Sequence, residues 1–385
     1  MVVPDWIWFA FIFAFGCCIG SFLNVVIYRL PHDKSVVSPP SACPKCGKYI
    51  RFYDNIPLVS WILLGRKCRY CKFPISPRYF IIELLTGLVF TGLFFLYFRT
   101  DMLIGIGPFL DGGWLIYLLH IILLAAFIAA SAIDLELWII PISICWFVTA
   151  AGLIGSTLGG YIIDHVRISQ SLLLPTAGIT AASLAVGAAI GTAVSLILLA
   201  TGLIKRSYEL EHYQDLPDQH VQSEEPQFNH RLEICKEIVF LLPIIACSML
   251  IYWITRESLP VRSWWANFLS QQPLFAGLLG SLWGYFVGCG IVWATRILGT
   301  LGFGKEAMGM GDVHLMGAAG TVIGPVFAVV AFFIAPFFGL VWAGFQMFFK
   351  KTRQIPYGPF LSLGILAVMI LHDRILAYLV FMLYH

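Results

Sequence analysis

The chain has 385 residues, of which 59% are hydrophobic and 12% are charged, and its formal net charge is +3. Soluble globular proteins contain about 25% charged residues, so a soluble enzyme of this length is excluded, because it could not bury so much apolar surface. The mean hydropathy of +0.85 and apolar runs long enough to cross a hydrocarbon core of ~30 Å predict an all-α polytopic membrane protein.

The first apolar run, at 6–28, is followed by the most basic part of the chain. The run is too long for a signal-peptide core, so we expect a retained transmembrane helix within 1–28. The loop at 29–79 contains ten of the 24 lysines and arginines but only two acids, Asp33 and Asp54. By the positive-inside rule this loop is predicted to be cytoplasmic, and the N-terminus to lie outside.

Further apolar runs predict the remaining spans, and they lie at 80–98, 114–134, 138–160, 172–204, 236–255, 274–297, 313–349 and 358–383. The 313–349 run is too long for one span, and the helix-breaking pair Gly324-Pro325 is expected to divide it into a short helix and a full one. The total is about ten transmembrane helices. Alternation of sides then places 135–137 and 298–312 in the cytoplasm.

These elements predict five parts in the chain. They are the first transmembrane helix at 1–28, a small cytoplasmic loop domain at 29–79, a membrane core at 80–149, a middle region at 150–273 and a second membrane core at 274–385. We expect the middle region to contain extra spans and an acidic cytoplasmic segment at 207–237.

Four cysteines in the basic loop form two Cys-x2-Cys pairs, Cys43 with Cys46 and Cys68 with Cys71. Two thiolates three residues apart on a tight turn can both point at one ion, and two such turns complete a tetrahedral site for Zn²⁺. A reducing cytoplasm argues against disulfides. The alternatives are chance pairs or a redox dithiol. Because four cysteines leave no open position, we expect the zinc to be structural.

Two acids stand at the edges of apolar runs, where charge is costly and usually functional. Asp134 ends the third run, and Asp312 follows the glycines of Gly309-Met-Gly311-Asp312. The topology places both acids at the cytoplasmic side, where a facing pair could share one proton, activate a water and protonate a substrate oxygen. Gly309 and Gly311 lack a Cβ and would let a substrate backbone approach. The alternative is that both acids are helix caps or loop residues.

Together these motifs resemble the type IV prepilin peptidases, the leader peptidase/N-methyltransferase family. The shared motifs stand at 20–31, 41–46, 54–57, 60–61, 65–71, 75–79, 83, 133–134, 140–141, 309–312, 317–320 and 355–360. The middle region is longer than is usual in this family, so 150–273 is family-atypical. The chain also has Ile142 and His314 where the family often has an acid and a lysine.

The resemblance implies a membrane aspartic endopeptidase in the bacterial inner membrane. Such an enzyme removes the short basic leader of type IV prepilins or pseudopilins on the cytoplasmic side, after a glycine. The family's catalytic aspartates correspond to Asp134 and Asp312. Members with the cysteine tetrad typically also methylate the new amino terminus with S-adenosylmethionine, but no motif identifies the cofactor-binding residues.

Two other functions fit parts of the sequence. A peptidase without methyltransferase activity would keep the acids and the zinc loop. A transporter would need acids along a path through the bilayer, whereas Asp134 and Asp312 are expected at one edge. We expect the lipid bilayer and pilin-like precursors as partners, and no nucleic acid.

Overall fold

The computed structural model describes residues 4–100, 103, 106–163, 172–207, 229–349 and 356–384. Most of the acidic segment expected at 207–237 lies outside these residues. Within them the chain is helical, apart from loops and two isolated β-bridges in the basic loop.

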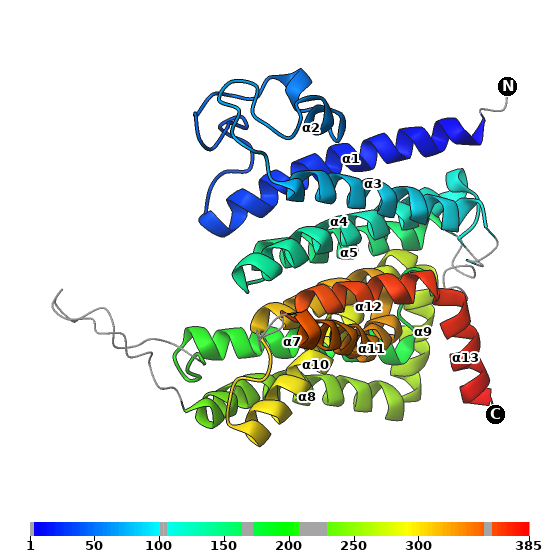
Figure 1. Cartoon of the computed structure of the whole chain (residues 1–385). Helices are drawn as coiled ribbons and strands as arrows, with labels where there is room; N and C mark the ends of the chain where they lie inside the picture. The colour runs from blue at the N-terminus through cyan, green and yellow to red at the C-terminus, as the bar shows by residue number, and fades with distance from the viewer. Residues whose placement is uncertain are drawn as a thin grey trace.

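Long apolar helices form most of the described structure (Figure 1). They are α1 (Asp5–Arg29), α3 (Pro77–Phe98), α4 (Trp114–Leu137), α5 (Ile142–Ile162), α7 (Ile179–Ala200), α8 (His230–Glu257), α10 (Pro273–Phe303) and α11 (Met310–Phe349). The shorter helices are α2 (Val59–Leu63), α9 (Leu259–Gln271), α12 (Gly358–Ile370) and α13 (His372–Tyr384). Single turns of other helix types are η1 (Leu30–His32), η2 (Phe52–Asp54) and η3 (Phe109–Gly113).

The number of spans is close to the expected total of about ten. The described residues contain 8 helices that are long and apolar enough to cross a membrane, or up to 9 if the bent pair α12–α13 counts as one span. The difference arises because 313–349, expected as a short helix and a full one, is counted here as the single candidate Met310–Gln346. Its predicted break at Gly324 is nevertheless present, with φ 79° and ψ 171° inside α11.

Contacts of α11 show that the chain reverses direction at this break. Before the break, Gly311 packs against Ile140, just beyond the end of α4. After it, Gly339 packs against Phe360 in the first turn of α12. Residues 311 and 339 therefore lie toward the same end of the bundle, and the glycine permits the reversal because it adopts positive φ without a Cβ clash.

Residues 256–272, which lie between the apolar runs at 236–255 and 274–297, contain the helix α9. Its aromatic side chains Trp264, Trp265 and Phe268 stack on one another, with ring centroids 5.5–5.6 Å apart. The sequence prediction missed this helix because it is too short and too polar to be read as a span.

The basic loop and the final turn of α4 lie at the same end of the bundle. α1 enters the loop at Arg29 and α3 leaves it at Pro77. Arg78, at the start of α3, forms an ion pair with Glu136 in the last turn of α4. Figure 1 shows the loop at the Arg29 end of α1, whereas α1 begins and α13 ends on the other side of the bundle.

Small residues set the closest helix contacts. A Cβ on Gly284 of α10 would overlap the carbonyl oxygen of Gly320 on α11, and a Cβ on Gly320 would overlap that of Gly284. Without a hydrophobic driving force between helices in lipid, close backbone approach at small residues is a main source of association. These two glycines therefore hold the start of α11 against α10.

Gly284→Ala is expected to destabilise the protein, because the obstacle is backbone that cannot rotate away. The expected cost is on the order of 1–3 kcal/mol, seen as a lower thermal midpoint in detergent. Gly290→Ala on the same helix is the matched control, since a Cβ there meets nothing within 4 Å. Equal midpoints for the two variants would contradict this packing argument.

Candidate active site

Asp134 lies in the last turn of α4 and is buried, with 6% of its surface exposed. The helix ends because Trp138 adopts the left-handed conformation (φ 60°), and its N–H donates to the backbone carbonyl of Asp134 at 3.0 Å. The N–H of Gly358, at the start of α12, donates to the Asp134 carboxylate oxygen Oδ2 at 3.0 Å. The start of one helix thus holds a carboxylate at the end of another.

Asp312 lies in the first turn of α11 and is also buried, with 8% exposed. Its Oδ1 has no hydrogen-bond partner among the described residues. Buried polar atoms are almost always hydrogen-bonded, so an unpartnered carboxylate oxygen is suited to bind a water or a substrate group.

The two carboxyl groups share their surroundings. Ile140 lies close to both Gly358 and Gly311. Its side chain would be 3.2 Å from a Cβ added to Gly358 and 2.8 Å from a Cβ added to Gly311. The Asp134 and Asp312 carboxyl groups are near enough to interact electrostatically. The expectation that these acids occupy one depth of the bundle therefore agrees with the structure. Such a pair can hold a water between a base and an acid.

The two glycines before Asp312 differ in their surroundings. A Cβ on Gly311 would meet the Ile140 side chain at 2.8 Å, so this glycine is required by packing within the protein. A Cβ on Gly309 would meet only Asp312 Oδ2, at 3.5 Å, and the backbone of Gly311, at 3.9 Å. Of the two, Gly309 is the one beside the carboxylate and free of neighbouring side chains.

The four loop cysteines converge, as their spacing predicted. One ligand atom from each of Cys43, Cys46, Cys68 and Cys71 lies within 4.8 Å of all the others, and the chain carries no disulfide between them. The Sγ atoms of Cys43 and Cys71 are 3.7 Å apart. A tetrahedron with Zn–S bonds of about 2.3 Å has edges of about 3.8 Å, so this group of thiols fits a zinc ion.

The two cysteine pairs are built by the same local turn. Gly47 N–H donates to the Cys43 carbonyl at 2.9 Å, and Lys72 N–H donates to the Cys68 carbonyl at 3.1 Å. Gly47 and Lys72 both have positive φ, 67° and 56°. These turns expose backbone N–H groups to the sulfurs, and the N–H groups of Cys71 and Tyr70 lower the pKa of Cys68 to about 7. A thiolate is the form that binds metal.

Polar contacts fix the loop to itself and to the helices. Arg69 donates to both oxygens of Asp54, and this hydrogen-bonded guanidinium lowers the pKa of the Asp54 carboxyl. Leu58 N–H donates to Glu83 Oε2 on α3 at 2.8 Å. These contacts attach the cysteine loop to the helix that follows it.

Two groups near Asp134 and Asp312 were not predicted from the sequence. Gly358 was quoted only as part of a motif, and the signal for its role was the unsatisfied N–H expected at the first turn of any helix. Arg296 belongs to none of the motifs described above. In the structure it lies buried near Asp312.

Comparison with known families gives two matches. The model of the bacterial peptidase A24 N-terminal domain matches residues 14–97, and the model of the type IV leader peptidase family matches residues 239–344. The first range contains the cysteine loop and the second contains Asp312, whereas Asp134 lies between them. The second range begins inside the middle region 150–273.

Comparison with curated proteins gives similar relatives. A prepilin leader peptidase/N-methyltransferase of Myxococcus xanthus (strain DK1622) is 46% identical over 134 residues, which are 34% of this chain and 36% of that protein. The protein of that name from Aeromonas hydrophila is 33% identical over 181 residues, 41% of this chain and 58% of the relative. The chain thus spans 36% and 58% of the first two relatives' lengths.

A longer alignment joins the chain to a type 4 prepilin-like proteins leader peptide-processing enzyme of Escherichia coli O78:H11 (strain H10407 / ETEC). The two are 27% identical over 374 residues, which are 92% of this chain and 91% of the relative. Because so much of this chain is covered, most of the middle region 150–273 lies inside the alignment. No solved structure matches the chain significantly.

Proposed function

We propose that this chain, whose residues 14–97 and 239–344 match two peptidase family models, is a membrane aspartic endopeptidase of the type IV leader peptidase family. It removes the short basic leader of type IV prepilins or pseudopilins after a glycine, at the cytoplasmic side of the bacterial inner membrane. The observation that carries the proposal is the buried pair Asp134 and Asp312, at the end of the bundle that also bears the basic loop.

In the proposed mechanism one carboxyl group is ionised and the other protonated. The ionised group takes a proton from a water, whose oxygen attacks the carbonyl carbon of the peptide bond, while the protonated group donates to the carbonyl oxygen. Collapse of the tetrahedral intermediate returns a proton to the leaving amine and breaks the C–N bond. Gly358 N–H keeps the Asp134 carboxylate in place, and the Oδ1 of Asp312, which has no hydrogen-bond partner among the described residues, is the atom that would bond to the water or the substrate.

Substrate binding uses the irregular backbone before α11. Gly309 has no Cβ and no neighbouring side chain other than Asp312, so an extended substrate backbone can pass close to the carboxylate there. Gly311 contributes by letting α11 approach Ile140.

The cysteine loop domain holds one structural zinc ion on its four thiolates. The ion has no open coordination position and stabilises the loop, with no part in the hydrolysis. S-adenosylmethionine, when bound, would supply a methyl group for the new amino terminus of the pilin. No motif of the chain identifies the residues that bind this cofactor.

The direct test is incubation of the purified chain, in detergent or in vesicles, with a pilin-like precursor. Cleavage between the basic leader and the apolar segment is expected. Cleavage should be lost when the glycine that precedes the cleaved bond is replaced by a larger residue. A chain that leaves the intact precursor uncut would refute the proposal. The mass of the mature amino terminus decides between methylated product and a peptidase without methyltransferase activity.

Gly358→Ala is expected to reduce kcat of leader cleavage by about tenfold to a hundredfold, the cost of displacing a catalytic group by about 1 Å. The reason is steric, because a Cβ at this position would lie 2.8 Å from Asp134 Oδ2. Gly339→Ala is the matched control, since its Cβ would make an ordinary contact of 3.7 Å with Phe360. Wild-type kcat in Gly358→Ala would show that the position of Asp134 does not limit the reaction.

A further inference from the structure

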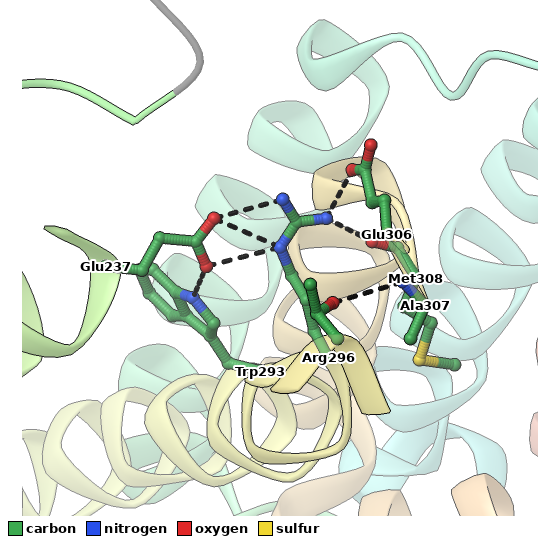
Figure 2. Close-up of polar contacts among 7 residues, drawn as sticks. Glu237, Trp293, Arg296, Glu306, Ala307 and Met308 are labelled. Carbon is green, nitrogen blue, oxygen red and sulfur yellow. Dashed lines mark hydrogen bonds and ion pairs between the residues drawn. The ribbon is translucent and has the colours of Figure 1, made fainter. Parts of the chain in front are cut away.

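A buried ion pair joins the middle region to the segment that carries Asp312. Arg296 on α10 and Glu237 on α8 have side chains that are 1% and 2% exposed. Figure 2 shows the Arg296 guanidinium between Glu237 on one side and the chain around Met308 on the other. The arginine therefore contacts two parts of the chain that are far apart in sequence.

The contact with Glu237 fixes the guanidinium. Arg296 Nη2 donates to Glu237 Oε1 at 3.0 Å, and Arg296 Nε donates to both carboxylate oxygens at 3.2 Å. The indole N–H of Trp293 donates to Glu237 Oε2 at 2.7 Å. Glu237 is thus held by donors on two side chains of α10, Arg296 and Trp293, and it sets the orientation of the planar arginine fork.

The other edge of the fork contacts the connection between α10 and α11. Arg296 Nη1 donates to the backbone carbonyl of Met308 and to the Glu306 carboxylate. Next to these contacts Ala307 N–H donates to Thr300 Oγ1 at 3.2 Å. The Met308 carbonyl immediately precedes Gly309. The hydrogen bond from Arg296 therefore restrains the backbone at the start of the Gly309–Asp312 motif.

This hydrogen bond restrains a stretch of backbone whose own residues restrain it little. Gly309 and Gly311 leave the motif with more conformational freedom than other residues would. Arg296 also lies within electrostatic range of the Asp312 carboxyl group. Asp312 is four residues after Met308, so movement of the Met308 carbonyl would displace the Asp312 carboxylate.

Stability alone is a poor reason for such a pair. The desolvation of two buried charges costs about as much as their attraction returns, and replacing both by apolar residues is often neutral or stabilising. Removing one partner, in contrast, leaves an uncompensated buried charge and destabilises strongly. A role in positioning therefore makes a different prediction from a role in stability. A variant that lacks both charges should fold normally but cleave the precursor slowly.

We propose that Arg296, oriented by Glu237, is a positioning residue that holds the backbone at Met308 and thereby aims Asp312 at the peptide bond. This inference rests on the proposed peptidase function. It also gives the middle region a role, because α8 contributes the carboxylate that orients the arginine.

The test compares the wild type with the double variant Arg296→Met/Glu237→Leu, which removes both charges together. We expect a thermal midpoint close to that of the wild type, kcat of leader cleavage lowered about tenfold to a hundredfold, and KM changed less than about twofold. Glu306→Gln is the matched control, because Glu306 is 45% exposed and an exposed partner contributes little. A double variant with wild-type kcat would overturn the proposal.

Arg296→Lys provides a second variant that keeps the charge next to Glu237. Its ammonium cannot span Glu237 and the Met308 carbonyl at once as the fork does, so we expect a folded protein with an intermediate kcat. If Arg296→Lys is folded and cleaves like the wild type, positioning by the fork is refuted, whatever the double variant does.

Hydrogen–deuterium exchange separates this inference from the proposed function, because it needs no activity. Amides at 304–309 are expected to exchange faster in the double variant and in Arg296→Lys, while those of the cysteine loop at 43–71 stay as in the wild type. Unchanged exchange at 304–309 would overturn the positioning role. If the wild type cleaves no precursor but the variants exchange faster than the wild type at 304–309, the peptidase proposal is refuted. The role of Arg296 in holding the Met308 backbone is then retained.

Discussion

Asp134→Asn and Asp312→Asn are each expected to lower the rate of leader cleavage by about a thousandfold, within the range of 10²–10⁴ that positioned acid–base groups supply. Asparagine keeps the size of the side chain and the acceptor for Gly358 N–H, so the fold is preserved. It cannot take a proton from water or donate one to the substrate oxygen. The measurement is the initial rate of precursor cleavage in vesicles at equal protein amounts.

The double variant Asp134→Asn/Asp312→Asn is expected to be hardly slower than either single variant. Residues that act as a unit show strongly non-additive effects, because losing one member already disables the other. Additive losses would instead indicate that the two carboxyl groups work independently. This comparison tests whether the pair acts as one catalytic device.

Glu136→Gln is the matched control for Asp134→Asn. Glu136 lies two residues further along the same helix and is paired with Arg78 in an exposed position, where an ion pair contributes little. We expect its cleavage rate to stay within about twofold of the wild type. Normal cleavage by a stable Asp134→Asn or Asp312→Asn protein would rule out the aspartic mechanism.

Cys43→Ser and Cys68→Ser are the second pair of variants with a large expected effect. Each removes one thiol of the four-cysteine cluster, and each is expected to lack the one zinc ion per chain that we expect in the wild type. Structural zinc contributes about 10–16 kcal/mol in small zinc domains, more than a loop of this size can replace from its own packing. Metal content of the purified protein, measured by mass spectrometry, gives the result.

Loss of zinc is expected to affect methylation, stability and peptide-bond cleavage to different extents. The loop is attached to α3 and α4 through Glu83 and the Arg78–Glu136 pair, but it contains neither Asp134 nor Asp312. Zinc loss should therefore reduce methylation and stability more than peptide-bond cleavage. Cys18→Ser is the control, since Cys18 is exposed on α1 and outside the cluster. Full zinc occupancy in Cys43→Ser would contradict the tetrahedral site.

Local chemistry explains what could be predicted from the sequence. The two Cys-x2-Cys turns need only the residues from Cys43 to Gly47 and from Cys68 to Lys72, so their spacing was enough to predict a four-thiol cluster. The break at Gly324 follows from a glycine before a proline, and the membrane class follows from the length of the apolar runs. Each of these depends on residues close together in the chain.

The parts that could not be predicted depend on contacts between distant residues. Gly358 is 224 residues from Asp134, and Arg296 is 59 residues from Glu237. Helices that are apolar on nearly every side carry no stripe that identifies the face turned toward a neighbour. The sequence therefore gave no means of deciding which N–H would meet Asp134 or which acid would meet Arg296.

The amino-acid sequence by itself determined a helical membrane protein with a four-cysteine loop and two candidate acids at one side of the bilayer, because apolar length, charge asymmetry and turn spacing are local properties. Only the tertiary structure decided that α11 reverses at Gly324, that α12 supplies a donor to Asp134, and that α8 supplies Glu237 to Arg296. These features come from the close approach of glycine faces such as Gly284 and Gly320, which fixes the partners of each helix through backbone contact in lipid.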